Sequence, residues 1–273
     1  MSETPQMTDR ASLLMHRARA GENPALFLHE GALADVQDRL SIVNKSFQSI
    51  AIVCPFQQVW RHSFPSADLI ADDDVLALNV AQYDLVIHAM ALHWANDPVG
   101  QLIQCRRALK PDGLLLVVVP GGQTLTELRS ALGQAEVEIT GGLSPRVLPM
   151  GDIRDLGALL QRAGLALPVA DSALLKTSYA SVLHLMKDLR AMGEANALSQ
   201  RIKTFTRRSV LLRAAELYTQ TYATADSRIP ATFELITLTG WAPDASQPQP
   251  LRPGSAAHRL SDALNTVETP LKD

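Results

Sequence analysis

The chain has 273 residues, which suffices for one large domain or for a domain with a substantial insertion. Its 47% hydrophobic and 19% charged residues are typical of a soluble globular protein, and its net charge of −3 favours neither nucleic acid nor an anionic membrane as a partner. The two cysteines, Cys54 and Cys105, exclude a disulfide framework, suit a reducing cytosol and have no metal-ligand partner at a telling spacing.

Two helices and a short strand are predicted in the first part of the chain. Apolar spacing indicates a basic amphipathic helix over residues 8–20 and a second helix over about 24–43. Residues 49–54 (Ser-Ile-Ala-Ile-Val-Cys) are typical of a short buried strand, which Pro55 ends. The chain therefore begins with helices and then enters a sheet.

The next unit of the chain has the clearest pattern. Leu85–Met90 is predicted as a buried strand, and a capped helix begins at Pro98, where the missing N–H costs nothing. The turn Lys110–Gly113 ends that helix, and the apolar run Leu114–Val119 forms a strand covered on both faces. Strand, helix and strand of these lengths form a right-handed crossover, which predicts a doubly wound α/β sheet.

Helices and strands continue through the second half. Thr124 and Glu127 have the spacing of a capping box at the start of a helix with an apolar stripe. The later pattern predicts helices over 152–163, about 181–192 and 207–223, and strands over 174–179 and 232–239. From residue 242 onward Pro, Gln, Ser and Ala dominate, and we expect a loosely attached tail.

With these elements in order, the chain resembles the class-I S-adenosylmethionine (SAM)-dependent methyltransferases. Three motifs carry the resemblance, Tyr83–Ile87, Leu92–Asp97 and Leu109–Gly113. More narrowly, it is similar to the branch that holds the biotin-pathway malonyl-carrier-protein methyltransferases and the arginine-hydroxylating assembly factor of respiratory complex I. Further motifs resemble the assembly factor and its bacterial counterparts: Gly121–Arg129, Gly141–Arg146, Asp188–Gly193, Pro230–Glu234 and Gly240-Trp241. The likeness covers about residues 9–260.

The resemblance implies a seven-stranded sheet whose last strand, 232–239, is antiparallel, and a helical cap over the active site. It also implies SAM as the cofactor. The expected organisation is N-terminal helices (1–45), a methyltransferase-like α/β core (46–179), a helical cap insertion (180–230), the final core strand (231–241) and a tail (242–273).

The first turn of the sheet departs from the family. A SAM site needs a glycine-rich turn after the first strand, because the backbone must approach the ligand with no side chain between them. This chain has Cys54, Pro55 and Phe56 there, with no glycine between Gly31 and Gly100. These residues predict a degenerate loop and impaired SAM binding.

The length of the following segment points the same way. Only residues 55–68 separate Cys54 from Leu69, and one crossover helix alone takes about a dozen residues. A helix, a strand and another helix cannot fit. Either the second strand is lost, or Ala67–Ala71 has taken its place and a later strand is gone, so the sheet is truncated near its first three strands.

Several residues are candidates for the cofactor site if SAM is bound. The resemblance matches Asp72 and Asp73 to an acidic pair near the adenine, and Ala89 and Met90 follow at the end of a central strand. With Asp74, the two aspartates are equally compatible with a solvated acidic turn. We favour the solvated turn because the glycine loop is missing.

His93 and Trp94 lie just past the same strand, where open α/β sheets place ligands. His93 is the candidate general base, since its ordinary pKa suits proton transfer at neutral pH. Trp94 is a candidate for substrate or partner contact. Both residues are as readily explained by packing of the loop onto the sheet, and we predict that His93 is not catalytic here.

Four further residues are candidates for binding a substrate or partner: Gly121, Gly122, Arg146 and Tyr179. A tight strand-to-helix turn is the favoured role of the two glycines, and an ion pair is the default for Arg146. Tyr179 fits the rim of a pocket and helix packing equally well. The basic pairs Arg106-Arg107 and Arg207-Arg208 are more typical of solvated helix faces than of binding sites.

Three functions remain open: an active SAM-dependent methyltransferase or related hydroxylase, a degenerate methyltransferase fold kept as a binding or assembly factor, and an unrelated small-molecule binder. We favour the second, a pseudoenzyme that binds a protein partner through its helical cap, in a respiratory complex or elsewhere. The longest apolar run, Leu114–Val119, is too short to span a bilayer, and we expect a cytoplasmic protein.

Overall fold

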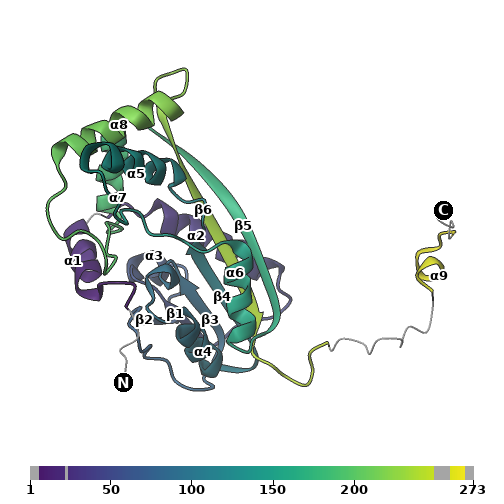
Figure 1. The fold of residues 1–273 in the computed structure, drawn as a ribbon. Coiled ribbons are helices and arrows are strands. Elements are labelled where there is room, and N and C mark those ends of the chain that lie inside the picture. Colours follow the sequence, from purple (N-terminus) through teal and green to yellow (C-terminus); the bar gives the residue numbers. More distant parts are fainter. Residues whose placement is uncertain (1–5, 22–23, 249–258, 268–273) are drawn as a thin grey trace. The chain divides into compact units, whose positions relative to one another are not determined.

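Six strands form one sheet in the order β2-β1-β3-β4-β6-β5 (Figure 1). The strands are β1 (Ile50–Val53), β2 (Asp68–Ile70), β3 (Tyr83–Ala89), β4 (Leu109–Pro120), β5 (Ala166–Tyr179) and β6 (Ile229–Trp241). The first four are parallel, whereas β6 is antiparallel to β4 and β5. The computed structural model describes residues 6–21, 24–248 and 259–267, and the number of strands refers to these residues. The α/β class and the antiparallel last strand are confirmed.

Relative to the family's seven strands, the sheet lacks one strand between β1 and β3, where the connecting segment is short. β2 pairs directly with β1 in parallel, with Ala51 opposite Asp68, so it occupies the place of the family's second strand. A single short helix, α3 (Gln57–Arg61), makes the connection. Of the two alternatives, Ala67–Ala71 has therefore taken the place of the second strand, and the described sheet has one strand fewer than the family's seven.

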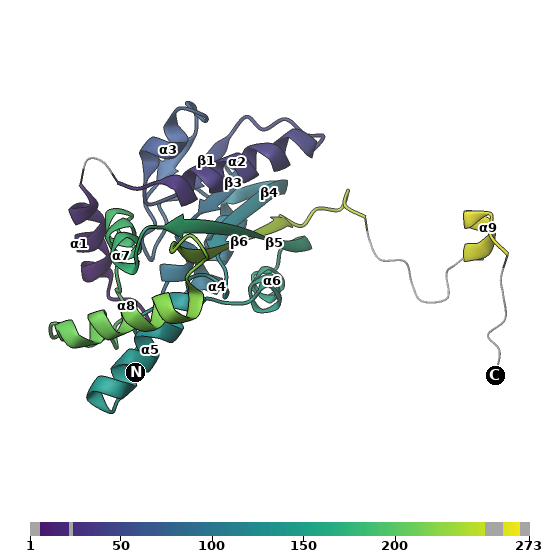
Figure 2. The ribbon, with the colours of Figure 1, turned by 90° about the horizontal axis from the view of Figure 1, so that it is seen from above.

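Helices cover both faces of the sheet (Figure 2). α2 (Phe27–Ile42) and α3 lie on one face, and α4 (Pro98–Ala108) and α6 (Ile153–Arg162) on the other. Along β4, Leu114, Leu116 and Val118 join the first core, while Leu115, Val117 and Val119 join the second. This double burial is why the strand reads as an unbroken apolar run.

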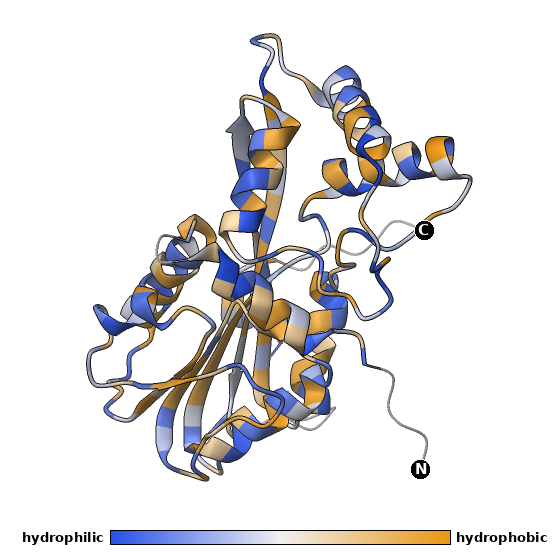
Figure 3. Ribbon diagram, turned by 90° about the vertical axis from the view of Figure 1, so that its left-hand side faces the viewer, coloured by the Kyte–Doolittle hydropathy of each residue, from blue (hydrophilic) through white to orange (hydrophobic). Residues whose placement is uncertain are grey.

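Four more helices gather to one side of the sheet, as Figures 1 and 2 both show. They are α1 (Arg10–Ala20), α5 (Thr126–Thr140), α7 (Val182–Ala191) and α8 (Arg208–Tyr222). Hydrophobic and hydrophilic residues alternate along the helices, as amphipathic packing requires (Figure 3). α7 and α8 fall within the segment predicted as a cap, although the domain division itself stays a prediction.

Two of the predicted helices begin with a side-chain cap. The Asp9 carboxylate accepts from the backbone N–H of Ser12 and begins α1. The Asp97 carboxylate accepts from the backbone N–H of Gly100 at 2.8 Å and begins α4, with Pro98 as its first residue. Both contacts satisfy N–H groups that a helix leaves free at its first turn.

The predicted capping box at α5 is wrong. The helix begins after Leu125, which adopts a left-handed conformation (φ 55°) and provides no side-chain cap. The Thr124 hydroxyl instead exchanges hydrogen bonds with the backbone of Glu234, 110 residues away, and Glu127 accepts from the Thr232 hydroxyl. The side chains of Thr124 and Glu127, which the local pattern assigned to the start of the helix, therefore bind strand β6 instead.

Two strand boundaries also differ from the prediction. β5 begins at Ala166 rather than near Leu174, because it is an exposed edge strand whose sequence lacks a clear alternation. β4 begins at Leu109, and Lys110–Gly113 form an irregularity between paired residues rather than a separate turn.

Residues 244–273 form a separate unit. Its described part contains one short helix, α9 (Leu260–Leu264). Within the ranges that the structure describes, no helix is both long enough and apolar enough to cross a membrane.

Candidate functional site

A cavity of about 550 Å³ lies where β3 and β4 end. Its core side is formed by residues just after these strands, and its other side by α5, α7 and the segment that joins α7 to α8. Representative lining residues are Met90, His93, Pro120, Leu128, Met192 and Phe205. The carboxyl ends of parallel strands are the usual ligand position in such sheets. The cavity is therefore the main candidate site.

Glu194 supplies the cavity with a carboxylate. It follows α7, and its Oε2 accepts from the indole N–H of Trp94 and, at 3.3 Å, from Nε2 of His93. Its Oε1 is buried and has no hydrogen-bond partner among the residues that the structure describes. The side chain is 19% exposed. Glu194 thus joins the segment after α7 to the loop after β3 and keeps one oxygen for a further donor.

Glu194 is ionised at neutral pH. Burial alone would raise the pKa of this carboxyl group, but the hydrogen bond and charge of His93, the charge of Arg17 and the hydrogen bond from Trp94 outweigh it. Together they lower the pKa of Glu194 to about 2. A largely buried carboxylate favours a cation or a strong hydrogen-bond donor as its ligand.

Two of the three arginines that line the cavity already bind other side chains. Arg146 binds Glu136 at 2.6 Å and the Thr206 hydroxyl at 2.8 Å. Arg201 binds Asp9 at 3.0 Å. Arg190 is exposed at the rim. Neutralisation of the first two leaves Glu194 as the charge inside the cavity that is available to a ligand.

The corner after β1, where the family resemblance places the cofactor loop, is packed with side chains of this chain. Cys54 is buried, and Phe56 is only 8% exposed. The Phe56 ring packs edge-on against His29 of α2, with 5.0 Å between centroids. Burial raises the pKa of the Cys54 thiol to about 12, with a further contribution from Asp72, so the thiol is inert.

Asp72 lies in the same corner and is bound by α1. Arg17 Nη1 lies 3.0 and 2.8 Å from its two oxygens, and Arg10 Nη1 lies 3.3 Å from Oδ2. The side chains of Arg17 and Asp72 are 8% and 7% exposed. Asp72 is therefore a buried ion pair rather than part of a solvated acidic turn, whereas Asp73 is 65% exposed.

His29 makes stability depend on pH. Burial lowers its pKa to about 4, from an ordinary 6.5, despite the opposing charges of Glu194 and Asp72. Between these values the unfolded chain binds more protons, so the free energy of unfolding should fall by roughly 3 kcal/mol as the pH drops from 6.5 to 4. Urea unfolding at pH 7 and pH 4.5 tests this, and His29→Gln should lose most of the dependence. Equal pH slopes for both proteins would contradict it.

The remaining predicted site residues divide into two groups. Met90, His93, Trp94 and Arg146 line the cavity. Ala89, Gly121, Gly122 and Tyr179 are not among its lining residues. Ala89 is buried in the core, and the Tyr179 hydroxyl donates to Asp188 at 2.8 Å. A Cβ on Gly121 would lie 2.4 Å from Glu234 Oε2, which fits the tight turn and not a ligand contact.

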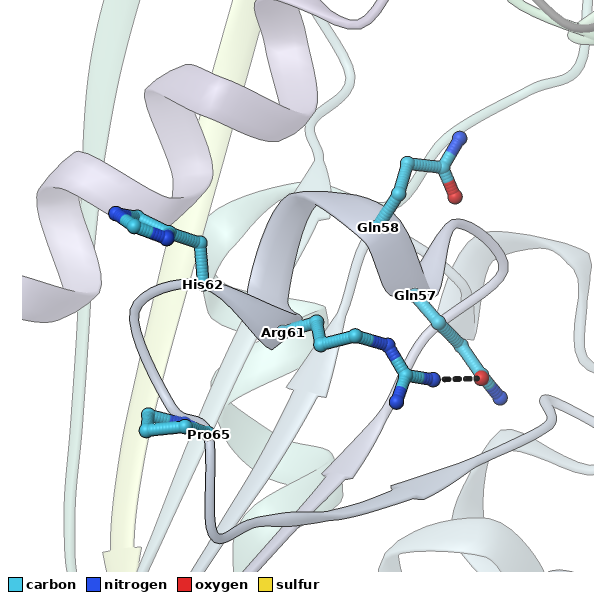
Figure 4. A pocket seen from close by; sticks show the side chains of 5 residues that line it. All are labelled: Gln57, Gln58, Arg61, His62 and Pro65. Atoms are coloured by element: carbon cyan, nitrogen blue, oxygen red, sulfur yellow. Dashed lines mark hydrogen bonds between the residues drawn. The ribbon is translucent and has the colours of Figure 1, made fainter.

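Another hollow, of about 620 Å³, lies on α3 (Figure 4). Gln57, Gln58, Arg61, His62 and Pro65 line it, and Arg61 Nη2 donates to Gln57 Oε1 at 3.4 Å. It is open to solvent and its lining contains no carboxylate, cysteine or serine. We therefore do not regard it as a candidate site.

Comparison with known proteins identifies methyltransferases and arginine-hydroxylases as relatives of this chain. A family model described as a methyltransferase domain matches residues 34–117. The mitochondrial arginine-hydroxylase NDUFAF5 of Danio rerio is 37% identical over 198 residues, which cover 72% of this chain and 61% of that protein. The human protein of the same name is 36% identical over 214 residues, or 78% and 62% of the two chains. The chain thus spans about three fifths of these relatives' length.

A second class of relative and the solved structures extend the comparison. The malonyl-[acyl-carrier protein] O-methyltransferase of Methylovorus sp. is 35% identical over 175 residues, covering 64% of this chain and 56% of that one. The YcgJ protein of Bacillus subtilis is 11% identical in sequence, with a TM-score of 0.48 over 79% of this chain and 100% of that chain.

Proposed function

Because the chain belongs to the class-I SAM-dependent methyltransferase superfamily and resembles the NDUFAF5 arginine-hydroxylases, we propose that it is a protein-binding factor that works without SAM. In this proposal, the cavity beneath the cap receives an arginine side chain of a partner protein. The observation that carries it is the contrast between a filled cofactor corner and an open cavity that contains an ionised carboxylate.

The residues in the cofactor corner do not fit an adenosyl group. Cys54 and Phe56 occupy the turn that must be free of side chains, and Phe56 is fixed against His29. Asp72, the acidic residue after β2, is already bound by two guanidinium groups of α1. SAM would have to displace both a packed aromatic ring and a buried ion pair, which supports loss of SAM binding.

Calorimetry with SAM should therefore show no binding heat at millimolar ligand concentration. A malonyl-carrier-protein methyltransferase serves as the positive control under the same buffer and temperature. Micromolar affinity for SAM would contradict the proposal. It would favour the alternative, an active methyltransferase or protein-modifying hydroxylase with an atypical cofactor loop.

The relatives suggest the ligand of the cavity. Their name includes arginine hydroxylation, and a guanidinium group matches a carboxylate in both charge and planar geometry. Glu194 Oε1 is the acceptor that remains unpaired among the described residues, and Leu128, Met186 and Met192 line the path for the aliphatic stem. His93 and Trp94 then act as positioning residues that hold Glu194.

The proposed partner is a protein rather than a free amino acid, because Ile202 and Phe205 line the cavity and are also exposed, and so offer a protein an apolar surface beside the ligand. The similarity to the complex I assembly factor makes a respiratory complex subunit the first partner to test. Both cysteines are buried and free, which supports a reducing compartment such as the cytoplasm.

A further inference from the structure

The strand β5 has an open edge. It pairs with β6 along one side and forms the outer border of the sheet on the other (Figure 1). Its central residues Ser172, Ala173 and Leu174 are all exposed. Since successive side chains point to opposite faces of a sheet, neither face of the strand is covered at this level. A long open edge of this kind is a template on which another strand can pair.

The backbone groups of Leu174 point towards the open edge. Along an antiparallel pair, opposite residues alternately exchange two hydrogen bonds and none. Ser178 and Pro230 are opposite each other and exchange none, because proline has no N–H. The pair Leu174–Glu234 falls in the same phase of the alternation. The Glu234 carbonyl accordingly points away from β5 and accepts from the Gly121 N–H at 2.9 Å.

The middle of the edge therefore presents unpaired backbone groups. Ser172, Leu174 and Lys176 share this phase, and their N–H and C=O groups have no hydrogen-bond partner in the part of the chain that the structure describes. At Ser178 the outward carbonyl is instead taken by Arg228 Nη2 at 2.7 Å. A second strand laid along residues 172–176 would satisfy all the unpaired groups at once.

We propose that β5 pairs with β5 of a second copy of this chain, antiparallel and around a two-fold axis at Leu174. Leu174 then lies opposite its own counterpart, and Ala173 lies opposite Leu175. Ser172 lies opposite Lys176, so the apolar centre of the pairing has polar ends. The hydrogen-bonded pairs that involve residues 172, 174 and 176 exchange two bonds each.

Charge and backbone shape favour this register. Registers centred on Asp171 or Lys176 would place like charges opposite each other, which destabilises a strand pair. A centre nearer the start of β5 would bring the irregularity between Ala166 and Val169 into the pairing. Asp171 itself does not oppose the contact, because Arg39 binds it from α2 at 2.7 Å.

Symmetry favours a second copy as the partner. A foreign strand would have to match the apolar centre and the Ser172 and Lys176 positions separately, whereas the chain's own edge matches them by rotation. The two-fold pairing uses the same edge on both copies and closes it, so that assembly stops at the dimer.

Analytical ultracentrifugation tests the pairing. The chain should dimerise with a Kd of about 10 µM or below. Leu174→Lys places two like charges on the axis and should raise the Kd about tenfold or more. Val137→Lys replaces an apolar side chain of α5 that is also 51% exposed, and should dimerise as the wild type does. A wild type that stays monomeric at about 100 µM, or equal Kd values for Leu174→Lys and the wild type, would overturn the proposal.

Cysteine cross-linking tests the register. Leu174→Cys should give a disulfide-linked dimer on mild oxidation, because the Cα atoms of a hydrogen-bonded pair lie about 5.5 Å apart. Ser172→Cys lies on the same face, but its counterpart would be about 13 Å away along the strands, and it should stay unlinked. The native cysteines are buried and give no background. A link through Ser172→Cys, or none through Leu174→Cys, would overturn the register. Neither test depends on the binding of SAM or arginine.

Discussion

Asp72→Ala should lower the free energy of unfolding by about 3–5 kcal/mol. The substitution leaves the guanidinium of Arg17 buried at 8% exposure without its counter-charge. Arg17 Nε and Nη2 are also buried without a partner among the described residues, so no other acceptor replaces the lost carboxylate. The cost is that of an uncompensated charge, which exceeds the net stabilisation of the pair itself.

Urea unfolding measures this loss, and Asp73→Ala is the matched control. Asp73 pairs with Arg10 at 3.4 Å but is 65% exposed, so its removal should change the free energy of unfolding by less than about 0.5 kcal/mol. Arg17→Met/Asp72→Leu should recover most of the stability. Equal effects of Asp72→Ala and Asp73→Ala would show that both belong to a solvated acidic turn.

Most of the fold could be predicted because its signals are local. The apolar run Leu114–Val119 and the helix start at Pro98 each depend on a few neighbouring residues, and each lies where the sequence places it. The length of segment 55–68 correctly predicted a truncated sheet, because chain length limits what can be built between two strands. The edge strand β5 was shortened in the prediction, since an exposed strand needs no apolar alternation.

The site was only half predictable because its contacts are distant in sequence. His93 and Trp94 were recognisable from their place after β3, but their partner Glu194 lies 101 and 100 residues away. Arg17 and Asp72 are 55 residues apart. The sequence around a charged residue on an amphipathic helix does not show whether its side chain faces solvent or forms a buried ion pair. The family motif Asp188–Gly193 ends directly before Glu194 and was the nearest available signal.

The filled corner after β1 and the open cavity are built mainly from different elements. The short connection through α3 brings Phe56 under α2, where His29 receives it, and α1 covers Asp72 from outside. The cavity is built from other elements, the ends of β3 and β4 with α5 and α7. The packing of the corner therefore need not disturb the cavity, and the two can be tested independently.

Glu194→Gln should abolish most of the affinity of the cavity for an arginine side chain. N-acetyl-arginine N-methylamide stands in for a residue of the partner, and its dissociation constant should rise about 30-fold or more, since removing one partner of a buried charge pair costs at least about 2 kcal/mol. Glutamine keeps the size of the side chain and an acceptor for the indole of Trp94, so the geometry is retained. The loss then reports on the charge.

Calorimetry or ligand-observed NMR measures the binding, with two controls. N-acetyl-citrulline N-methylamide has nearly the same shape but no charge, and should bind the wild type as weakly as the arginine compound binds Glu194→Gln. Glu138→Gln removes a carboxylate that is 36% exposed and pairs with Arg213 outside the cavity, and should bind arginine normally. If the arginine compound bound Glu194→Gln and the wild type equally, the carboxylate would not be the recognition group. The proposed guanidinium ligand would then lack a counter-charge, because the other charged groups discussed in the cavity, Arg146 and Arg201, are themselves cations.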